Sequence, residues 1–358
     1  MDARSTIRQS PPVDVSKPYD ASRLRGRTVV ITGAARGLGA AMAAAWAGRG
    51  AHVVVGDVDD GAGEALVARL RAAAGPADPP CVYQRCDVTD WAQQVALFET
   101  AVRTSPRGVV DVVVPNAGIL LVDEGIRFEE PVPLGPAPGS GPGHGPGPGP
   151  ALPRPSVAML DVNIVGVTYT AHLALHHLSQ NPSPDRCLLL VGSFASLTPL
   201  PGQAQYTMSK HAVAGLFRSL RGTAALRHGI RVNMVAPYYV GGTRMLQPLV
   251  EAAYLAGSAG PAEVPDVVDA ATRLVADPAV AGRALVVGPR LRPGPHGEMP
   301  VADGEGEGRG RAAWECYAHD YDEVETFTWR YVRMLNVIAR ARGSLAWIRD
   351  LWNIFRRR

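Results

Sequence analysis

The stretch that most constrains this chain runs from a short apolar segment through a glycine-rich turn into a helix. Residues 28–31 (TVVI) form a β-branched run, typical of a strand buried on both faces. They lead directly into TGAARGLG at 32–39 and an alanine-rich helical segment at 40–48. Glycines at such a turn let the backbone approach a pyrophosphate, whose charge then faces the helix N-terminus. This context predicts a nucleotide site with contacts from Gly33, Arg36, Gly37, Leu38 and Gly39.

The end of the second predicted strand, residues 51–56, bears on which nucleotide binds. Asp57 follows that strand, and an acidic residue about 20 positions beyond the glycines is placed to accept hydrogen bonds from the ribose of NAD. Its charge would repel the 2′-phosphate of NADP, and residues 58–60 (VDD) supply no compensating base. Arg36 argues for the other cofactor, since its guanidinium could bind a phosphate. We therefore expect NAD, with NADP as the alternative.

Strands and helices alternate along the next part of the chain. Helix signals at 63–74 precede a predicted strand at 81–86, and a helix carrying Val95, Leu97 and Phe98 precedes another at 109–114. This alternation indicates βαβ units. The predicted fold is α/β, a doubly wound parallel sheet of the Rossmann type, forming a single domain over residues 25–290.

Tyr206 and Lys210 stand four residues apart in a segment predicted to be helical, so their side chains share one face. A fixed ammonium can lower the pKa of a phenol, which is ordinarily near 10. Such a tyrosine can exchange protons with a carbonyl or alcohol oxygen near neutral pH. Taken alone, Y-x-x-x-K is a weak signal that a solvated helix face explains better, and the other motifs of the chain are needed to favour the catalytic interpretation.

Together these motifs resemble the short-chain dehydrogenase/reductase family, in the subtype termed classical. The resemblance spans roughly residues 25–290 and rests on T-G-x-x-x-G-x-G at 32–39, N-A-G at 116–118, Y-x-x-x-K at 206–210, Ser193 placed 13 residues before Tyr206, and Asn163. It implies an NAD(P)-dependent oxidoreductase acting on CH–OH groups, which transfers a hydride between the cofactor and a secondary alcohol or ketone.

The resemblance also implies roles for individual residues. Tyr206 would be the general acid/base, and Lys210 would lower the pKa of that tyrosine and hold the nicotinamide ribose. Ser193 would donate a hydrogen bond to the substrate oxygen, and Asn163 would hold a water that links Lys210 to solvent. The cofactor contacts implied beyond the glycine turn and Asp57 are Asp87, Val88, Asn116, Ala117, Gly118, Tyr206, Lys210, Pro237, Val240 and Thr243.

The chain departs from the family pattern at residues 129–156, a low-complexity insertion. Its central part, 135–150, reads GPAPGSGPGHGPGPGP, in which thirteen of sixteen positions are Gly or Pro. Such a segment cannot bury apolar area and is expected to be a disordered or extended loop, with His144 solvated. The insertion leaves a strand end near the expected substrate entrance. It could therefore act as a lid over the substrate, or it could be a tolerated low-complexity segment without a role in the reaction.

A second departure follows the predicted catalytic helix. Where the family has Pro-Gly, this chain has Pro237 and Tyr238, with one additional residue before Thr243. The segment expected to cover the substrate, 245–254 (MLQPLVEAAY), is largely apolar, as are Phe194, Leu197 and Leu200. This favours a hydrophobic or lipid-like alcohol, although packing of a core or a lid would give the same composition.

The two ends of the chain are predicted to lie outside the family domain. Residues 1–24 are expected to form a flexible arm, 291–322 a linker, and 323–358 an amphipathic helical tail. Apolar and aromatic residues beside the closing arginines 356–358 are typical of a helix at a membrane interface. Packing on the chain's own domain, packing on a dimer partner, and disorder are the alternatives for this tail.

Composition removes several other classes. A net charge of +3 is too mild to indicate nucleic-acid binding, and no run of 18 apolar residues predicts a spanning helix. The four cysteines lack CxxC spacing, so neither a metal site nor a disulfide framework is expected, and a reducing compartment fits. We expect a cytoplasmic homo-oligomeric enzyme for an apolar small molecule, without a secretory signal. The competing hypotheses are a nucleotide-binding scaffold without turnover and a peripheral membrane protein.

Overall fold

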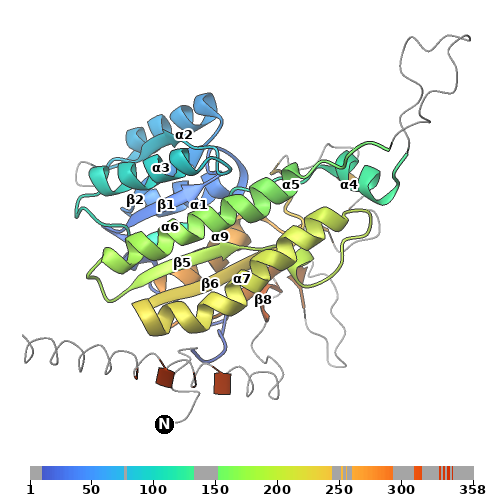
Figure 1. Ribbon diagram of the computed structural model, residues 1–358. Coiled ribbons are helices and arrows are strands. Elements are labelled where there is room, and N and C mark those ends of the chain that lie inside the picture. Colours follow the sequence, from blue (N-terminus) through green and yellow to red (C-terminus); the bar gives the residue numbers. More distant parts are fainter. Residues whose placement is uncertain are drawn as a thin grey trace, which may run out of the picture.

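An eight-stranded sheet with strand order β3-β2-β1-β4-β5-β6-β7-β8 runs through the centre of the protein (Figure 1). The computed structural model describes residues 10–75, 79–132, 152–243, 251–252, 255, 260–292 and 310–316, and within the tail 330, 331, 334, 337, 338 and 341. The strands are β1 (Thr28–Thr32), β2 (His52–Asp57), β3 (Val82–Arg85), β4 (Val112–Val114), β5 (Arg186–Val191), β6 (Ile230–Pro237), β7 (Ala284–Leu291) and β8 (Arg311–Cys316).

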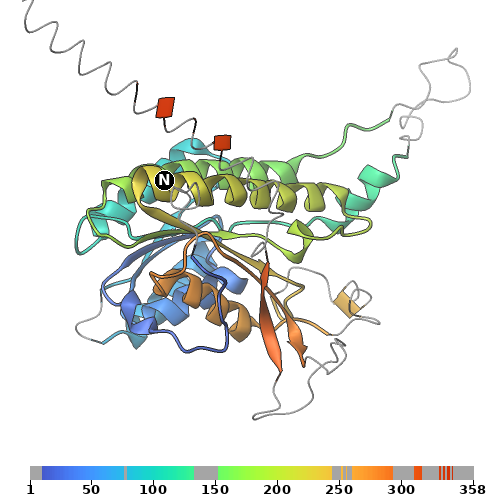
Figure 2. The ribbon, with the colours of Figure 1, turned by 90° about the horizontal axis from the view of Figure 1, so that it is seen from below.

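Helices cover both faces of this sheet. On one face lie α1 (Gly37–Ala47), α2 (Asp60–Ala73) and α9 (Val264–Ala276), and on the other lie α3 (Trp91–Thr104), α6 (Val167–Gln180) and α7 (Ala204–His228). Figure 2 shows the two helical layers with the sheet between them. Continuous apolar strands such as β1, whose five residues are all buried, fit a parallel sheet covered on both faces. The predicted doubly wound α/β fold is confirmed.

The reversal of strand order next to β1 positions the site. From β1 the chain moves outward through β2 and β3, then returns to β4 on the other side of β1. Ligands of doubly wound sheets bind at the carboxyl ends of the strands beside such a switch point. Short elements follow these ends: α4 (Val122–Glu129), α5 (Ala158–Leu160), a π-helical turn at Asp161–Gly166 and a 3-10 turn at Phe194–Ser196.

The predicted linker 291–322 needs correction because it contains strand β8. This strand pairs antiparallel with β7, whereas the other strands described pair in parallel. The Glu315 carboxylate on β8 lies 3.5 Å from Nε of the buried Arg283 on the β7 side. Sequence patterning missed β8 because RAAWEC shows no alternation of apolar and polar residues.

The predicted flexible arm, residues 1–24, is also corrected over its described part. The Arg273 guanidinium donates to the carbonyl oxygens of Lys17 and Val15 and lies 4.5 Å from the ring centroid of Tyr19. The backbone N–H of Val13 donates to Glu315 at 2.9 Å. Residues 10–19 are therefore fastened to α9 and β8, and the 3-10 turn Ala21–Leu24 buries Leu24 completely. Residues 1–9 lie outside the described part.

The insertion and the tail fall largely outside the described residues. From 129–156 the structure describes 129–132 and 152–156, so the predicted Gly/Pro loop at 135–150 and His144 are not covered. In the tail, 330, 331, 334, 337, 338 and 341 are helical and exposed. Among the described helices, Ala158–Gln180 is long and apolar enough to cross a bilayer by length and composition, but its α6 part packs in the core.

Candidate active site

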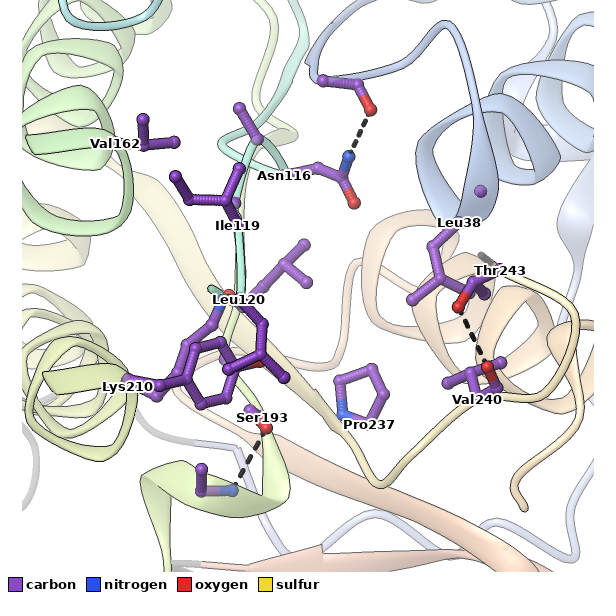
Figure 3. A pocket seen from close by; sticks show the side chains of 18 of the residues that line it. Leu38, Asn116, Ile119, Leu120, Val162, Ser193, Lys210, Pro237, Val240 and Thr243 are labelled. Carbon is purple, nitrogen blue, oxygen red and sulfur yellow. Dashed lines mark hydrogen bonds between the residues drawn. The ribbon is translucent and has the colours of Figure 1, made fainter. Parts of the chain in front are cut away.

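A cleft of about 540 Å³ opens at the carboxyl ends of the central strands. The glycine turn lies at one end of it and Ser193, Tyr206 and Lys210 at the other. Figure 3 shows Leu38, Val240 and Thr243 on one side of this pocket and Leu120, Lys210 and Ser193 on the opposite side. The predicted site residues that line the cleft are Gly33, Arg36, Gly37, Leu38, Asp57, Asp87, Val88, Asn116, Ala117, Gly118, Ser193, Tyr206, Lys210, Pro237, Val240 and Thr243.

The glycine turn fits closely against the N-A-G segment after β4. Gly33 has φ +63°, and a Cβ on it would stand 2.5 Å from the Cα of Ala117. The side-chain amide of Asn116 donates to the carbonyl oxygens of Thr32 at 2.9 Å and Gly33 at 2.8 Å (Figure 3 draws the second). Gly39 does not line the cleft; a Cβ there would meet Asn116 Nδ2 at 2.6 Å, so its role is the close packing of α1.

The Asp57 carboxylate organises the wall of the cleft at the end of β2. One of its oxygens accepts from the backbone N–H of Ala35 at 2.8 Å and the other from that of Asp59 at 3.0 Å. Arg36 is held by Asp59, with Nη2 2.6 Å from Oδ2, and both side chains are substantially exposed. The guanidinium that could meet a 2′-phosphate therefore already has a carboxylate partner.

Tyr206 and Ser193 form the polar centre at the other end of the cleft. Tyr206 is only 6% exposed, and burial raises the pKa of its phenol, while a hydrogen bond with Ser193 acts in the lowering direction. Ser193 begins the turn Phe194–Ser196, and its Oγ accepts from the backbone N–H of Ala195 at 3.1 Å (Figure 3). The serine hydroxyl is thus fixed beside the phenol.

Lys210 lies one helical turn after Tyr206 and is equally buried. Its Nζ is 5.8 Å from the Tyr206 ring centroid and donates to the carbonyl oxygen of Val191 at 3.3 Å. Burial lowers the pKa of Lys210 from 10.5 to about 8. The expected lowering of the Tyr206 pKa by Lys210 is not among the causes that act on this phenol, whose pKa burial raises.

Asn163 sits in the π-helical turn before α6 and does not line the cleft. Its Oδ1 accepts from the backbone N–H of Ile119 at 2.8 Å, and its Nδ2 donates to Ile119 O at 2.9 Å and to Ser209 Oγ at 3.1 Å. The side chain therefore joins the segment after β4 to the catalytic helix. A Cβ on Gly118 would lie 3.4 Å from Asn163 Oδ1 and 3.5 Å from Lys210 Nζ, so these three residues converge.

The loop after β6 completes the cleft. Thr243 Oγ1 donates to the carbonyl oxygen of Val240 at 2.9 Å. Tyr238, which stands where the family has glycine, packs edge-on against Phe194 with ring centroids 5.0 Å apart, and both rings line the cleft. Most of the segment 245–254 lies outside the described residues, and Leu197 does not line the cleft although Leu200 does.

Sequence reasoning missed several lining residues. Ile119, Leu120 and Leu121 line the cleft. Because they directly follow the N-A-G motif, they could have been predicted from that position. Val162 immediately precedes Asn163, and Cys86 precedes Asp87 at the end of β3. Burial raises the pKa of the Cys86 thiol to about 12, so this group is neutral and apolar in character.

Comparison with known proteins agrees with this geometry. A sequence model of the short chain dehydrogenase family matches residues 27–132 and 153–253. The chain belongs to this family. The match leaves residues 133–152 uncovered, so the Gly/Pro-rich segment is additional to the shared family sequence.

Several relatives of this short-chain dehydrogenase are themselves named dehydrogenases. It is 32% identical over 286 residues to a 5′-hydroxyaverantin dehydrogenase of Dothistroma septosporum, covering 75% of this chain and 87% of the relative. It is 33% identical over 299 residues to one from Emericella nidulans, covering 78% and 88%. An NADP-dependent dehydrogenase of Phoma sp. is 29% identical over 308 residues, covering 80% and 83%. These similarities establish an oxidoreductase of this family.

Proposed function

We propose that this protein transfers a hydride between a nicotinamide dinucleotide and a secondary alcohol or ketone of an apolar small molecule. The observation that carries the proposal is that one cleft joins the glycine turn to Ser193, Tyr206 and Lys210. The turn suits a dinucleotide, because Gly33 and Gly37 line the cleft between the end of β1 and the N-terminus of α1, where a pyrophosphate is favoured. The bound cofactor would supply the hydride acceptor or donor.

The residues of this chain handle the proton. In alcohol oxidation, the Tyr206 phenolate takes the hydroxyl proton of the substrate, and in ketone reduction the phenol returns a proton to the developing alkoxide. Ser193 donates a hydrogen bond to the same substrate oxygen and stabilises its charge. The Lys210 ammonium, 5.8 Å from the Tyr206 ring centroid, would favour the phenolate through its charge and would hold the nicotinamide ribose. Asn163 holds the segment at Ile119 against the catalytic helix.

The cofactor proposed is NAD. Asp57 presents a carboxylate to the cleft at the end of β2, and the exposed residue after it is Val58, which cannot balance a phosphate. Arg36 is paired with Asp59. Two relatives are named NADP-dependent dehydrogenases, so NADP is the competing cofactor, and the ratio of the two activities has to be measured.

An apolar substrate is proposed from the walls around Tyr206. Ile119, Leu120, Leu121 and Leu200 pack against the cluster that contains Tyr206 and line the cleft, as the Phe194–Tyr238 ring pair does. Relatives are named for 5′-hydroxyaverantin and for (+)-borneol, which supports a small organic alcohol. A screen of apolar secondary alcohols and ketones with both cofactors, followed by NADH or NADPH fluorescence, would identify the substrate.

The test of the catalytic assignment is Tyr206→Phe. This variant keeps the ring that packs in the cluster with Met159 and Ala195 but removes the acid/base hydroxyl. We expect nearly all turnover to be lost while NADH binding stays close to normal. Substantial remaining turnover would remove Tyr206 from the mechanism, and an inactive wild type that still binds NADH would favour the scaffold alternative.

A second proposal concerns the tail, residues 323–358, for which we propose contact with a membrane surface. Tyr331, Met334, Val337 and Ile338 are helical and 41–59% exposed, which leaves about half of each side chain open to an apolar surface. Apolar helix residues beside arginines suit an interface. Flotation with anionic liposomes should decrease on removal of 323–358, and equal flotation of both forms would exclude it.

A reducing compartment, and hence a cytoplasmic location, is proposed from the cysteines. Cys81, Cys86, Cys187 and Cys316 are all free, and the first three are buried. Burial raises the pKa of the Cys81 and Cys187 thiols, which makes them unreactive core residues. Fluorescence microscopy of the tagged protein would test the location.

A further inference from the structure

The two described flanks of the Gly/Pro-rich insertion converge on the first turn of α7, the helix that carries Tyr206. The flank before the insertion is α4 (Val122–Glu129), and the flank after it runs from Ser156 into α5. Figure 1 shows α4, α5 and the start of α7 at the same end of the molecule. The contacts that join them involve residues 203–205, immediately before Tyr206.

The flank before the insertion holds α7 by two hydrogen bonds. Glu129 Oε1 accepts from the backbone N–H of Ala204 at 2.9 Å, and Gln203 Nε2 donates to the carbonyl oxygen of Val122 at 3.0 Å. A Cβ on Gly125 would stand 2.4 Å from Gln203 Oε1, so the backbone of α4 lies directly against this amide. The start of α7 is therefore in contact with α4 from its first residue, Val122, to its last, Glu129.

The flank after the insertion holds the same turn from another direction. Gln205 Nε2 donates to the carbonyl oxygen of Ser156 at 2.7 Å. Three residues further on, Met159 is fully buried and packs with Tyr206 and Ala195 in a small apolar cluster. Leu121, from the other flank, adjoins this cluster, and its backbone N–H points to Met159 Sδ at 3.4 Å. Both flanks thus contribute to the wall around the phenol.

These contacts replace an ordinary helix cap. Gln203 occupies the N-cap position of α7 and makes no side-chain capping bond of its own. Glu129 supplies an acceptor to one of the first N–H groups instead, and its negative charge is favourable at a helix N-terminus. Gln203 and Gln205 are 5% and 2% exposed, so losing either donor would remove a hydrogen bond made by a buried side chain.

We propose that Gln203, Gln205 and Glu129 are positioning residues that fix Tyr206 relative to Ser193 by anchoring both ends of the insertion to the first turn of α7. The inference rests on the proposed role of Tyr206 as general acid/base. Its physical basis is that Ser193, in the turn after β5, and Tyr206, in the first turn of α7, line the same cleft from two different elements, so the distance between their hydroxyl groups depends on where the turn at 203–205 is held.

The test uses Gln205→Met, which preserves side-chain length but cannot donate to Ser156. The matched control is Asn181→Leu, because Asn181 is also a buried amide, with hydrogen bonds to Val110 and Asp111 at the opposite end of the sheet. We expect kcat of Gln205→Met to fall about 10- to 100-fold, as small misplacements of reacting groups do. The NADH dissociation constant should stay unchanged, and the acidic limb of the oxidation pH profile should move to higher pH.

The control should lose thermal stability without change in kcat or in that limb. An unchanged kcat and pH profile in Gln205→Met, together with a lower Tm like that of the control, would overturn the proposal. Glu129→Ala provides a second measurement, because the exposed Glu129 can be replaced without threatening the core. Its kcat should fall relative to Glu130→Ala, which changes the adjacent exposed carboxylate, and equal kcat values would contradict the capping role.

Failure of this inference is separate from failure of the proposed function. If Tyr206→Phe abolishes turnover and Gln205→Met and Glu129→Ala do not alter it, Tyr206 is the acid/base but the flanks do not position it. If Tyr206→Phe remains active, the proposed function itself is wrong.

Discussion

Lys210 donates from Nζ to the carbonyl oxygen of Val191 across 3.3 Å, from a side chain that α7 keeps buried. Burial lowers the pKa of this lysine from 10.5 to about 8. Below pH 8 the lysine is protonated in both folded and unfolded chains, so the folded protein carries the full free-energy cost of burying the charged ammonium. Between about pH 8 and 10.5 the unfolded chain binds the proton and the folded chain does not, so stability rises with pH.

The prediction is that the free energy of unfolding of the wild type increases relative to Lys210→Met over this range, by up to about 3 kcal/mol. Denaturant unfolding of both proteins at several pH values from 7 to 10.5 measures it. A constant difference between them would show that the lysine titrates near its ordinary pKa in the folded protein.

Ser193→Ala should affect both the rate and its pH dependence. The hydrogen bond with Ser193 lowers the pKa of the Tyr206 phenol, so its loss leaves burial unopposed and raises that pKa. We expect kcat to fall by about 10²–10³, the usual effect of removing one donor to a developing oxyanion. The acidic limb of alcohol oxidation should shift to higher pH, because the phenolate then forms only at higher pH. A lower rate with an unshifted acidic limb would show that Ser193 does not influence the pKa of Tyr206.

The cofactor preference can be moved at the end of β2. Replacing Asp57 by Ser and Val58 by Arg removes the carboxylate and adds a cation next to the cleft. The ratio of kcat/KM for NADP to that for NAD should increase, because a 2′-phosphate then meets a base instead of an acid. Val58→Arg alone is the control and should shift the ratio less. If the double variant keeps the wild-type ratio, Asp57 does not read the ribose.

Substitutions at Gly33 and Gly108 distinguish the effect of a steric clash from the effect of backbone strain. Both have positive φ, but a Cβ on Gly33 would meet the backbone of Ala117 at 2.5 Å, whereas one on Gly108 would meet nothing within 4 Å. Gly108→Ala should cost only the strain of a left-handed residue, about 1–2 kcal/mol. Gly33→Ala should cost more and weaken NADH binding, as chemical denaturation and fluorescence titration would show. Equal losses of stability would mean that the loop at Ala117 moves aside freely.

Much of the cleft could be predicted from sequence because its residues lie at fixed offsets within single elements. The turn at 32–39 joins one strand to one helix, and Tyr206 and Lys210 share one helical face. The backbone geometry of those elements then brings the side chains to the carboxyl ends of the strands. The switch point next to β1 follows from the same alternation of strands and helices.

The parts that escaped prediction depend on contacts between distant residues. Arg311–Cys316 becomes strand β8 because β7 offers it an edge, and its own pattern carries no strand period. The segment at 10–19 looks like a polar arm until Arg273 supplies donors for its carbonyl groups. Likewise, the amide of Asn163 binds Ile119 and Ser209, partners 44 and 46 residues away, which a motif cannot specify.

The pairing of Arg283 with Glu315 has a practical consequence for anyone who shortens this chain. A protein cut after residue 290, the end of the family domain predicted from sequence, would lose β8 and would leave the hydrogen-bonding edge of β7 open to other chains. Arg283 would keep its buried charge without the nearby carboxylate, and Val13 would lose its acceptor. The shortest variant that stays folded and does not aggregate should therefore extend through Cys316. Because Val13 binds Glu315, a truncation that removes β8 should also affect the segment at 10–19.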